Sequence, residues 1–168
     1  MRAIITHPDV RLRRVSSRVD VFDDLLLALV EELEQAMGAG PGGVGIAAPQ
    51  LGELQRIILV DCRQARRPCP HHGPLVMVNP EILFAEGESL GREGCLSVPD
   101  WVGMVPRASA VGVAYQDVAG ERHEIESSGF EARVIQHEID HLNGILFINR
   151  VISTHDLVRR LPADVKTG

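Results

Sequence analysis

Two histidines spaced four residues apart, His137 and His141, are the residues of this sequence whose types and spacing could most clearly perform chemistry. On a helix, side chains at positions i and i+4 lie one above the other, so two imidazoles can bind one metal ion. Glu138 lies about 100° round the helix from His137, from where its carboxylate can reach a water molecule at the metal. The pattern therefore predicts a metal site with an acid–base group beside it.

A third metal ligand is predicted at Cys95, within the segment Glu93-Gly94-Cys95-Leu96-Ser97. The thiol lies at the end of a predicted strand, and the neighbouring glycine permits a close approach of the backbone. One thiolate and two imidazoles leave a fourth position open, which is typical of catalytic metal sites and not of structural ones. Taken alone, Cys95 could equally be a small buried hydrophobic residue, as most free cysteines are.

The segment that carries the histidines is predicted to be a buried helix. Ser128 and Glu131 have the spacing of a capping box that begins a helix, and Asn143-Gly144 ends it after Leu142. The apolar residues between these limits lie on more than one face, which predicts burial. Buried polar groups are costly without partners, so a bound metal would explain the histidines and acidic residues there.

The other elements can be placed by hydrophobic period and turn residues. An amphipathic helix is predicted over residues 23–37 and ends at the glycine-rich run 38–43. Strands are predicted over residues 56–62, 75–78, 88–96, 110–116 and 122–126, with a hairpin turn at 118–121. A short helix is expected around 154–160, followed by a frayed tail after about 162. No repeat or linker divides the sequence, so we expect a single domain over residues 1–168.

The composition is that of a globular protein, with 45% hydrophobic and 24% charged residues in a chain of 168. There are 17 Lys and Arg against 23 Asp and Glu, and this net charge of −6 argues against a general DNA or RNA binder. We find neither a signal-peptide layout nor an apolar run that could span a bilayer, so we expect a cytoplasmic protein without membrane association. Three cysteines cannot all pair with one another, which agrees with a reducing compartment.

Three separated motifs resemble those of peptide deformylases, in the order and at the spacing of that family. The motifs are Gly43-Val44-Gly45-Ile46-Ala47-Ala48-Pro49-Gln50, Glu93-Gly94-Cys95-Leu96-Ser97 and Gln136-His137-Glu138-Ile139-Asp140-His141. Similarity at His7-Pro8-Asp9, Val78-Asn79-Pro80 and Val105-Pro106-Arg107 extends the resemblance over nearly the whole chain. Departures are mild: Ile46 stands where leucine is usual, and Asn149 where aspartate is common.

The resemblance implies an α+β fold, in which antiparallel β-sheets surround a central helix that carries the HExxH metal motif. It implies that Cys95, His137 and His141 bind one divalent metal ion, with water in the fourth place. Glu138 would then act as general base towards that water and later as general acid towards the departing amine.

The resemblance also assigns roles around the metal. The Gln50 side-chain amide and the Leu96 backbone N–H would stabilise the oxyanion of the tetrahedral intermediate, and Gly45 would let the backbone approach the substrate. Asp140 would form a buried ion pair with Arg107, although an exposed helix charge is the competing interpretation. The methionine pocket would be lined by Val44, Phe130, Val134 and the aliphatic part of Arg133, the first three of which could equally be ordinary core.

The implied activity is removal of the N-terminal formyl group from formylmethionine of nascent polypeptides. Ferrous iron is the metal that the resemblance favours in the cell, and zinc, nickel or cobalt could occupy the site in purified protein. The substrate would be met as it leaves a bacterial-type ribosome, with or without direct contact near the exit tunnel. The enzyme would act there as a monomer or a weak dimer.

Several alternatives remain open at this level. A metallopeptidase-like hydrolase shares the helical motif, but such enzymes commonly take their third ligand downstream of it, as a histidine or glutamate. A deformylase paralogue with a different N-acyl substrate would keep the whole site. A non-catalytic metal module would need a fourth protein ligand and no Glu138, and a cysteine-nucleophile hydrolase would leave the paired histidines unexplained. The segment Cys69-Pro70-His71-His72 lacks a regular four-ligand spacing, so we expect no metal site there.

Overall fold

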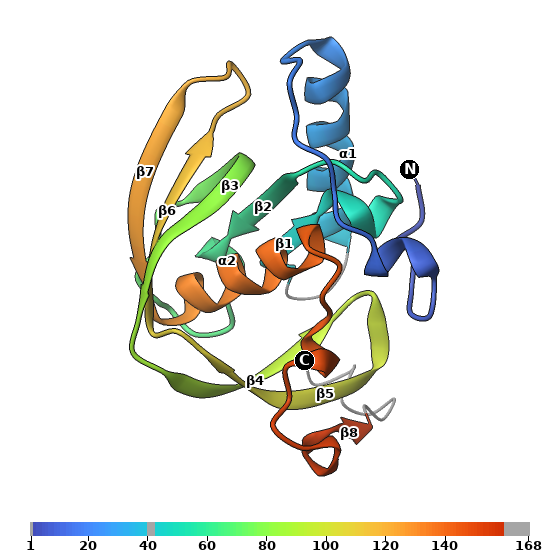
Figure 1. Ribbon diagram of the computed structural model, residues 1–168, viewed down its shortest axis with the longest axis vertical. Helices are drawn as coiled ribbons and strands as arrows, with labels where there is room; N and C mark the ends of the chain where they lie inside the picture. Colours follow the sequence, from blue (N-terminus) through green and yellow to red (C-terminus); the bar gives the residue numbers. More distant parts are fainter. Residues whose placement is uncertain (1, 40–42, 160–168) are drawn as a thin grey trace.

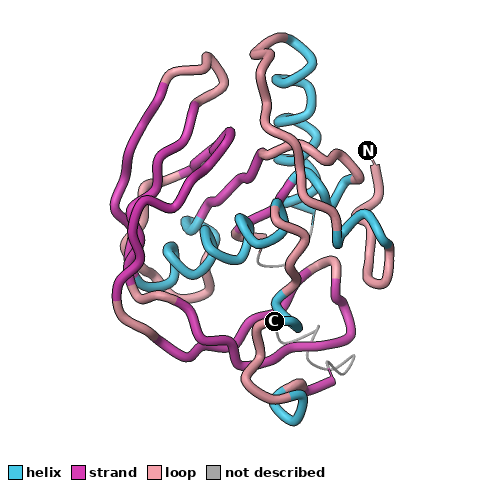
Figure 2. Tube along the Cα trace, viewed as in Figure 1, coloured by secondary structure: helices cyan, strands magenta, loops and turns pink. Residues whose placement is uncertain are grey.

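The chain folds around one helix that crosses the middle of the molecule. In this computed structural model, which describes residues 2–39 and 43–159, helix α2 lies between two antiparallel β-sheets (Figures 1 and 2). The elements are α1 (Asp24–Ala39), β1 (Gly45–Ala47), β2 (Ile57–Asp61), β3 (Pro74–Glu86), β4 (Ser89–Cys95), β5 (Val98–Arg107), β6 (Ala110–Gln116), β7 (Arg122–Ser128), α2 (Gly129–Leu142) and β8 (Val158–Arg159). No helix among the described residues is long and apolar enough to cross a membrane.

The larger sheet has the strand order β1-β2-β3-β6-β7 and is covered by a helix on each face. Strand β2 explains this arrangement, because all five of its residues are buried and successive side chains point to opposite faces. Ile58 and Val60 pack in the cluster that contains the apolar side of α2. Ile57 and Leu59 pack in the other cluster, with the buried leucines of α1. The metal-motif helix is therefore held against one face of a sheet whose other face is closed by α1.

The smaller sheet, with the order β4-β5-β8, lies on the other side of α2 (Figure 1). Strands β4 and β5 form an antiparallel hairpin in which Glu93 pairs with Gly103 and Cys95 pairs with Val98. Val98 and Val105 of β5 pack in a third apolar cluster with Leu12, Leu146 and Phe147. Strands β1 and β4 are edge strands of their respective sheets, so among residues 2–39 and 43–159 each pairs with a neighbouring strand on one side alone.

The ends of α2 are fixed by contacts that come from distant parts of the chain. Ser128 is the N-cap, but the predicted capping box is wrong, because Ser128 makes no side-chain cap hydrogen bond. The Glu131 carboxylate accepts instead from the Ser127 hydroxyl at 2.8 Å and from the His72 backbone N–H at 2.7 Å. At the other end, Arg56 donates to the carbonyl oxygen of Leu142 at 3.0 Å, which satisfies one of the last carbonyls of the helix.

The predicted helix end at Asn143-Gly144 is confirmed. The helix finishes at Leu142, Asn143 is the C-cap, and Gly144 adopts a φ of 73°, a backbone conformation that favours glycine.

The predicted fold class is confirmed, whereas several element boundaries are wrong. Strands β1, β5 and β8 were not predicted, and the strand expected over 75–78 continues to Glu86. The helix expected around 154–160 is a 3-10 turn at Thr154–Asp156 followed by β8, because Arg159 pairs with Trp101 of β5. The glycine run at 40–42 and the tail from 160 lie outside the described residues.

Helix α1 offers a test of which side chains hold the fold together. Leu33 is fully buried against the larger sheet, whereas Leu25 on the same helix is 79% exposed. We expect Leu33→Ala to lower the free energy of unfolding by about 2–5 kcal/mol, because it removes buried surface and leaves a cavity. Leu25→Ala should change it by less than about 0.5 kcal/mol. Urea unfolding of both variants measures the difference, and equal effects would contradict the placement of α1.

Candidate metal centre

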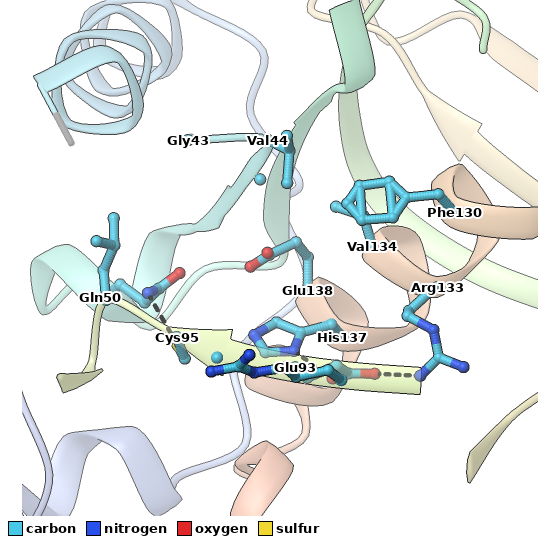
Figure 3. Close-up of a pocket in the computed structure, with 14 residues that line it drawn as sticks. Gly43, Val44, Gln50, Glu93, Cys95, Phe130, Arg133, Val134, His137 and Glu138 are labelled. Atoms are coloured by element: carbon cyan, nitrogen blue, oxygen red, sulfur yellow. Dashed lines mark hydrogen bonds and ion pairs between the residues drawn. The ribbon is translucent and has the colours of Figure 1, made fainter. Parts of the chain in front are cut away.

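The three predicted metal ligands lie together between the end of β4 and the C-terminal half of α2. One donor atom from each of Cys95, His137 and His141 lies within 4.8 Å of the others. Cys95 Sγ is 3.4 Å from Nε2 of His141, and the two imidazole rings have their centroids 5.2 Å apart. Cys95 and His137 face each other across the site in Figure 3. The two histidines of α2 and the cysteine at the end of β4 therefore lie close enough together to share one ion, as predicted.

A buried carboxylate orients the first histidine. Glu93 Oε1 is 2.8 Å from Nδ1 of His137, so Nδ1 carries the proton and Nε2 is left to face the site. Glu93 and Cys95 lie two residues apart on β4, which places both side chains on the same face of the strand. Burial opposes ionisation of Glu93, but hydrogen bonds from Arg107 and His137 lower its pKa to about 2. The carboxylate is therefore charged when it holds His137.

The residues of the site fit a divalent metal ion. His141 turns its Nε2 towards Cys95 Sγ, and within the described part of the chain Glu138 Oε1 is a buried polar atom without a hydrogen-bond partner. Burial lowers the pKa of His141 well below its ordinary value, which favours the neutral imidazole that binds metal. Burial also raises the pKa of Glu138 to about 7, a value suited to a group that both takes and gives a proton. One thiol and two imidazoles leave a further coordination position open.

The metal centre opens into a cavity of about 220 Å³. Its lining comes from residues 43–45 and Gln50, from residues 92–96, and from Phe130, Arg133, Val134, His137 and Glu138 of α2. In Figure 3, Gln50 and Cys95 stand at one side of this cavity, and Phe130 and Arg133 stand at the opposite side. The predicted pocket-lining residues therefore do line a cavity that begins at the metal centre.

The Gln50 amide is oriented by its own turn. Its Oε1 accepts the backbone N–H of Ala47 at 2.9 Å, so the amino group is the end that faces the site. That Nε2 donates to Ser97 Oγ at 3.1 Å and lies 3.7 Å from Cys95 Sγ. Leu96, the residue whose backbone N–H was assigned to the same role, also lines the cavity. Two potential donors are thus available beside the predicted metal ligands.

Gly45 is required by close packing against α2. A Cβ atom at this position would lie 2.5 Å from Glu138 Oε2 and 2.8 Å from Val134 Cγ1. Real Cβ atoms do not approach neighbours this closely, so a larger residue would displace the Glu138 carboxylate. Besides its predicted place at the substrate, the glycine therefore makes room for the acid–base residue.

An ion-pair network surrounds the metal ligands, and the sequence revealed only part of it. The predicted pair between Arg107 and Asp140 is confirmed, with Nη1 and Oδ2 2.6 Å apart and both side chains buried. Arg150 adds two further hydrogen bonds to Asp140, each of 2.9 Å. The role of Glu93 was missed, although its alternation with Cys95 along a predicted strand was a usable signal. Glu93 accepts hydrogen bonds from His137, a predicted metal ligand, and from Arg107, and so joins the two parts of the network.

A second cluster of possible ligands lies away from the cavity. Among the described residues, the other group with ligand atoms this close is Asp117, Glu121 and His123, which is largely exposed on the β6–β7 turn. Exposed acidic clusters are common without a metal, so this group carries no functional assignment. His72 is bound to Glu131, and no three ligands of the segment 69–72 come together within the described residues.

Comparisons with known proteins agree with this geometry. The family model of polypeptide deformylase matches residues 1–156. The curated peptide deformylase of Thermomicrobium roseum is 44% identical over 155 residues, which cover 90% of this chain and 86% of that protein. The solved structure of a peptide deformylase from Thermotoga maritima has a TM-score of 0.83 and 38% identity, and the match covers 91% of this chain and 99% of that one. A Met-Ala-Ser-bound peptide deformylase from Acinetobacter baumannii matches with a TM-score of 0.82 and 39% identity, over 90% of this chain and 98% of that one.

The orienting role of Glu93 can be tested by metal affinity. We expect Glu93→Gln to weaken zinc binding about 10- to 100-fold, because the neutral amide no longer fixes the His137 ring or matches the two arginines beside it. Competition between the protein and a chelator measures this affinity. Glu124→Gln is the matched control, since Glu124 is exposed on β7 and forms an ion pair of 2.6 Å with Arg122. Unchanged affinity in Glu93→Gln would contradict the role.

Proposed function

The chain belongs to the polypeptide deformylase family, and we infer that Cys95, His137 and His141 hold the metal ion with which it removes N-formyl groups from nascent peptides. The enzyme is a metal-dependent hydrolase by family. The observation that carries the residue assignment is the meeting of three donor atoms within 4.8 Å beside the unsatisfied Oε1 of buried Glu138. The cavity that opens from this point gives a peptide N-terminus access to it.

Glu138 moves the protons of the reaction. A water molecule attacks the formyl carbon, and the Glu138 carboxylate takes one of its protons. When the C–N bond breaks, the same carboxyl group delivers that proton to the departing α-amine, so that formate and a free N-terminus are released. A pKa raised by burial to about 7 leaves both protonation states accessible near neutral pH.

The negative charge that develops on the formyl oxygen needs donors at fixed positions. Gln50 and Leu96 are proposed to supply them, from the side-chain Nε2–H and the backbone N–H respectively. The contact between Gln50 Oε1 and the Ala47 N–H supports this assignment, because it holds the amide in one orientation before substrate arrives. A bound divalent ion supplies Lewis-acid activation of the carbonyl and a lowered pKa of water.

The peptide itself is proposed to lie between the two sheets. Residues on both sides of the cavity belong to edge strands, β1 and β4, whose free backbone groups can pair with an extended chain. The first side chain would enter the space lined by Val44, Phe130, Val134 and Arg133. The Met-Ala-Ser bound to the Acinetobacter baumannii relative supports a substrate that begins with methionine.

Ferrous iron is the proposed working metal, with zinc, nickel or cobalt as possible occupants of purified protein. A thiolate with two imidazoles suits several of these ions, so the donor set alone does not select iron. An iron enzyme of this type should be sensitive to oxidation, because oxidation of Cys95 would destroy a ligand.

We further propose that the chain acts in the cytoplasm as a single catalytic domain over residues 1–168. Both sheets and α2 contribute to one site, which supports a single domain. Action as a monomer or a weak dimer is part of the same proposal. Contact with the ribosome near the exit tunnel remains part of this proposal.

One variant at Glu138 and one at Cys95 distinguish metal binding from catalysis. Glu138→Ala should keep the metal but lower kcat at least about 100-fold, because the proton carrier is gone. Cys95→Ala should lose both metal and activity. Cys69→Ala is the control, since this half-buried thiol does not line the cavity. Metal analysis and formate release are measured on the same preparations, and full activity in Glu138→Ala would refute the mechanism.

The reaction itself is tested with protein purified anaerobically. We expect release of formate from formyl-Met-Ala-Ser that depends on added ferrous iron. Acetyl-Met-Ala-Ser is the matched substrate for a paralogue with a different N-acyl preference. Cleavage of the acetyl peptide alone, with iron bound, would replace deformylation by that alternative.

A further inference from the structure

The two proposed donors to the formyl oxygen lie on short turns that belong to different sheets. Gln50 is in the 3-10 turn Ala48–Leu51, which directly follows β1 of the larger sheet. Leu96 lies in the two-residue turn between β4 and β5 of the smaller sheet, where Cys95 pairs with Val98. Each donor must lie within about 2.7–3.1 Å of the oxyanion, so both can act only if the two turns keep a fixed separation.

The N-terminal segment, residues 4–7, connects the two turns through its backbone. The Ile5 N–H donates to the carbonyl oxygen of Gln50 at 2.8 Å. The His7 N–H donates to the carbonyl oxygen of Ser97 at 2.7 Å, and Ser97 directly follows the second proposed donor in its turn. The two acceptor residues are also joined to each other, because Gln50 Nε2 donates to Ser97 Oγ at 3.1 Å. Both are buried, so these hydrogen bonds lie away from solvent.

The side chains of the same segment pack on both sides of the gap between the turns. Ile4 packs against the apolar cluster that contains Ala48 and Leu51 of the Gln50 turn. Ile5, the next residue, packs against the cluster that contains Val98 of β5. The two sheets share no strand among the described residues, so contacts of this kind are needed to hold one turn in place relative to the other. The segment therefore binds both turns through its side chains as well as its backbone.

We propose that residues 4–7 are a positioning element that sets the distance between the Gln50 amide and the Leu96 N–H. The inference rests on the proposed function, because it concerns the same two donors. Within the described chain, the lining of the cavity includes none of residues 4–7, so the segment acts through the turns and not by contact with substrate. The negative charge on the formyl oxygen develops in the transition state. A displaced donor should therefore lower kcat more than it changes KM.

The first test removes one backbone donor of the segment. His7→Pro has no N–H to donate to Ser97, whereas His7→Ala keeps the N–H and loses only an exposed side chain. With formyl-Met-Ala-Ser as substrate and rates expressed per bound metal ion, we expect His7→Pro to lower kcat about 10- to 100-fold, the scale of a donor displaced by about 1 Å. KM should stay within about twofold of wild type, and His7→Ala should keep both constants within about the same range.

A second pair of variants keeps every backbone N–H and decides the inference even if His7→Pro does not fold. Ile5→Ala loosens the segment where it packs against the smaller sheet. Ile148→Ala is the matched control, because Ile148 is also a half-buried isoleucine packed against this cluster but lies outside the segment. We expect Ile5→Ala to lower kcat about tenfold with little change in KM, and Ile148→Ala to change kcat less than about twofold.

Nuclear magnetic resonance of the zinc-loaded, 15N-labelled protein gives a comparison that needs no catalysis. The signals of the Gln50 side-chain amide and the Leu96 backbone N–H should shift or broaden in His7→Pro and Ile5→Ala, and should keep their wild-type positions in the two controls. They decide the inference even if the wild-type enzyme releases no formate, an outcome that would count against the proposed function alone. Unchanged signals in both variants would overturn the inference. So would an equal fall of kcat in Ile5→Ala and Ile148→Ala, because the effect would then be general.

Discussion

The structure depends on a buried carboxylate that holds several positively polarised groups at once. Glu93 accepts hydrogen bonds from His137, from Arg107 and from Arg133, which come from two different elements. Removing such a charge from water is expensive unless partners replace the hydration. Here the partners are His137, a predicted metal ligand, and two guanidinium groups, so the hydrogen bonds that compensate one buried charge also align α2 with the smaller sheet.

The second buried acid extends the same arrangement. Asp140 accepts from Arg107 and Arg150, so Arg107 bridges the two carboxylates. Water is largely excluded between the two sheets, so the polar side chains of α2 must form hydrogen bonds with other protein groups there. A buried network in which every polar group has a hydrogen-bond partner favours one packing geometry. A network with unpartnered groups lowers the stability of the fold. Among the described residues, Glu138 Oε1 is one of the buried polar atoms without a hydrogen-bond partner, and it lies beside the predicted metal ligands, where an unsatisfied carboxylate oxygen can serve function.

The sequence predicts the parts of this protein that are local and misses those that are not. Four-residue spacing was enough to place His137 and His141 on one side of a helix, whereas the grouping of Cys95 with them was implied by the resemblance to a family and not by any local pattern. The capping box failed because Glu131 is engaged by Ser127 and by the distant His72. The C-terminal helix failed because its segment pairs with β5. Nothing within either segment encodes those distant partners, and the same holds for the arginines that converge on Glu93.

The open edges of β1 and β4 have a consequence for the range of proteins that such an enzyme can serve. Backbone N–H and C=O groups are common to every polypeptide, so a cleft that reads them gains affinity without regard to the residues that follow the first. In the binding mode proposed above, the only side chain of the substrate that would be recognised is the first one, in the space lined by Val44, Phe130, Val134 and Arg133. An enzyme that binds in this way would recognise the first residue of a protein and not the sequence that follows. A single enzyme could then act on proteins of many different sequences.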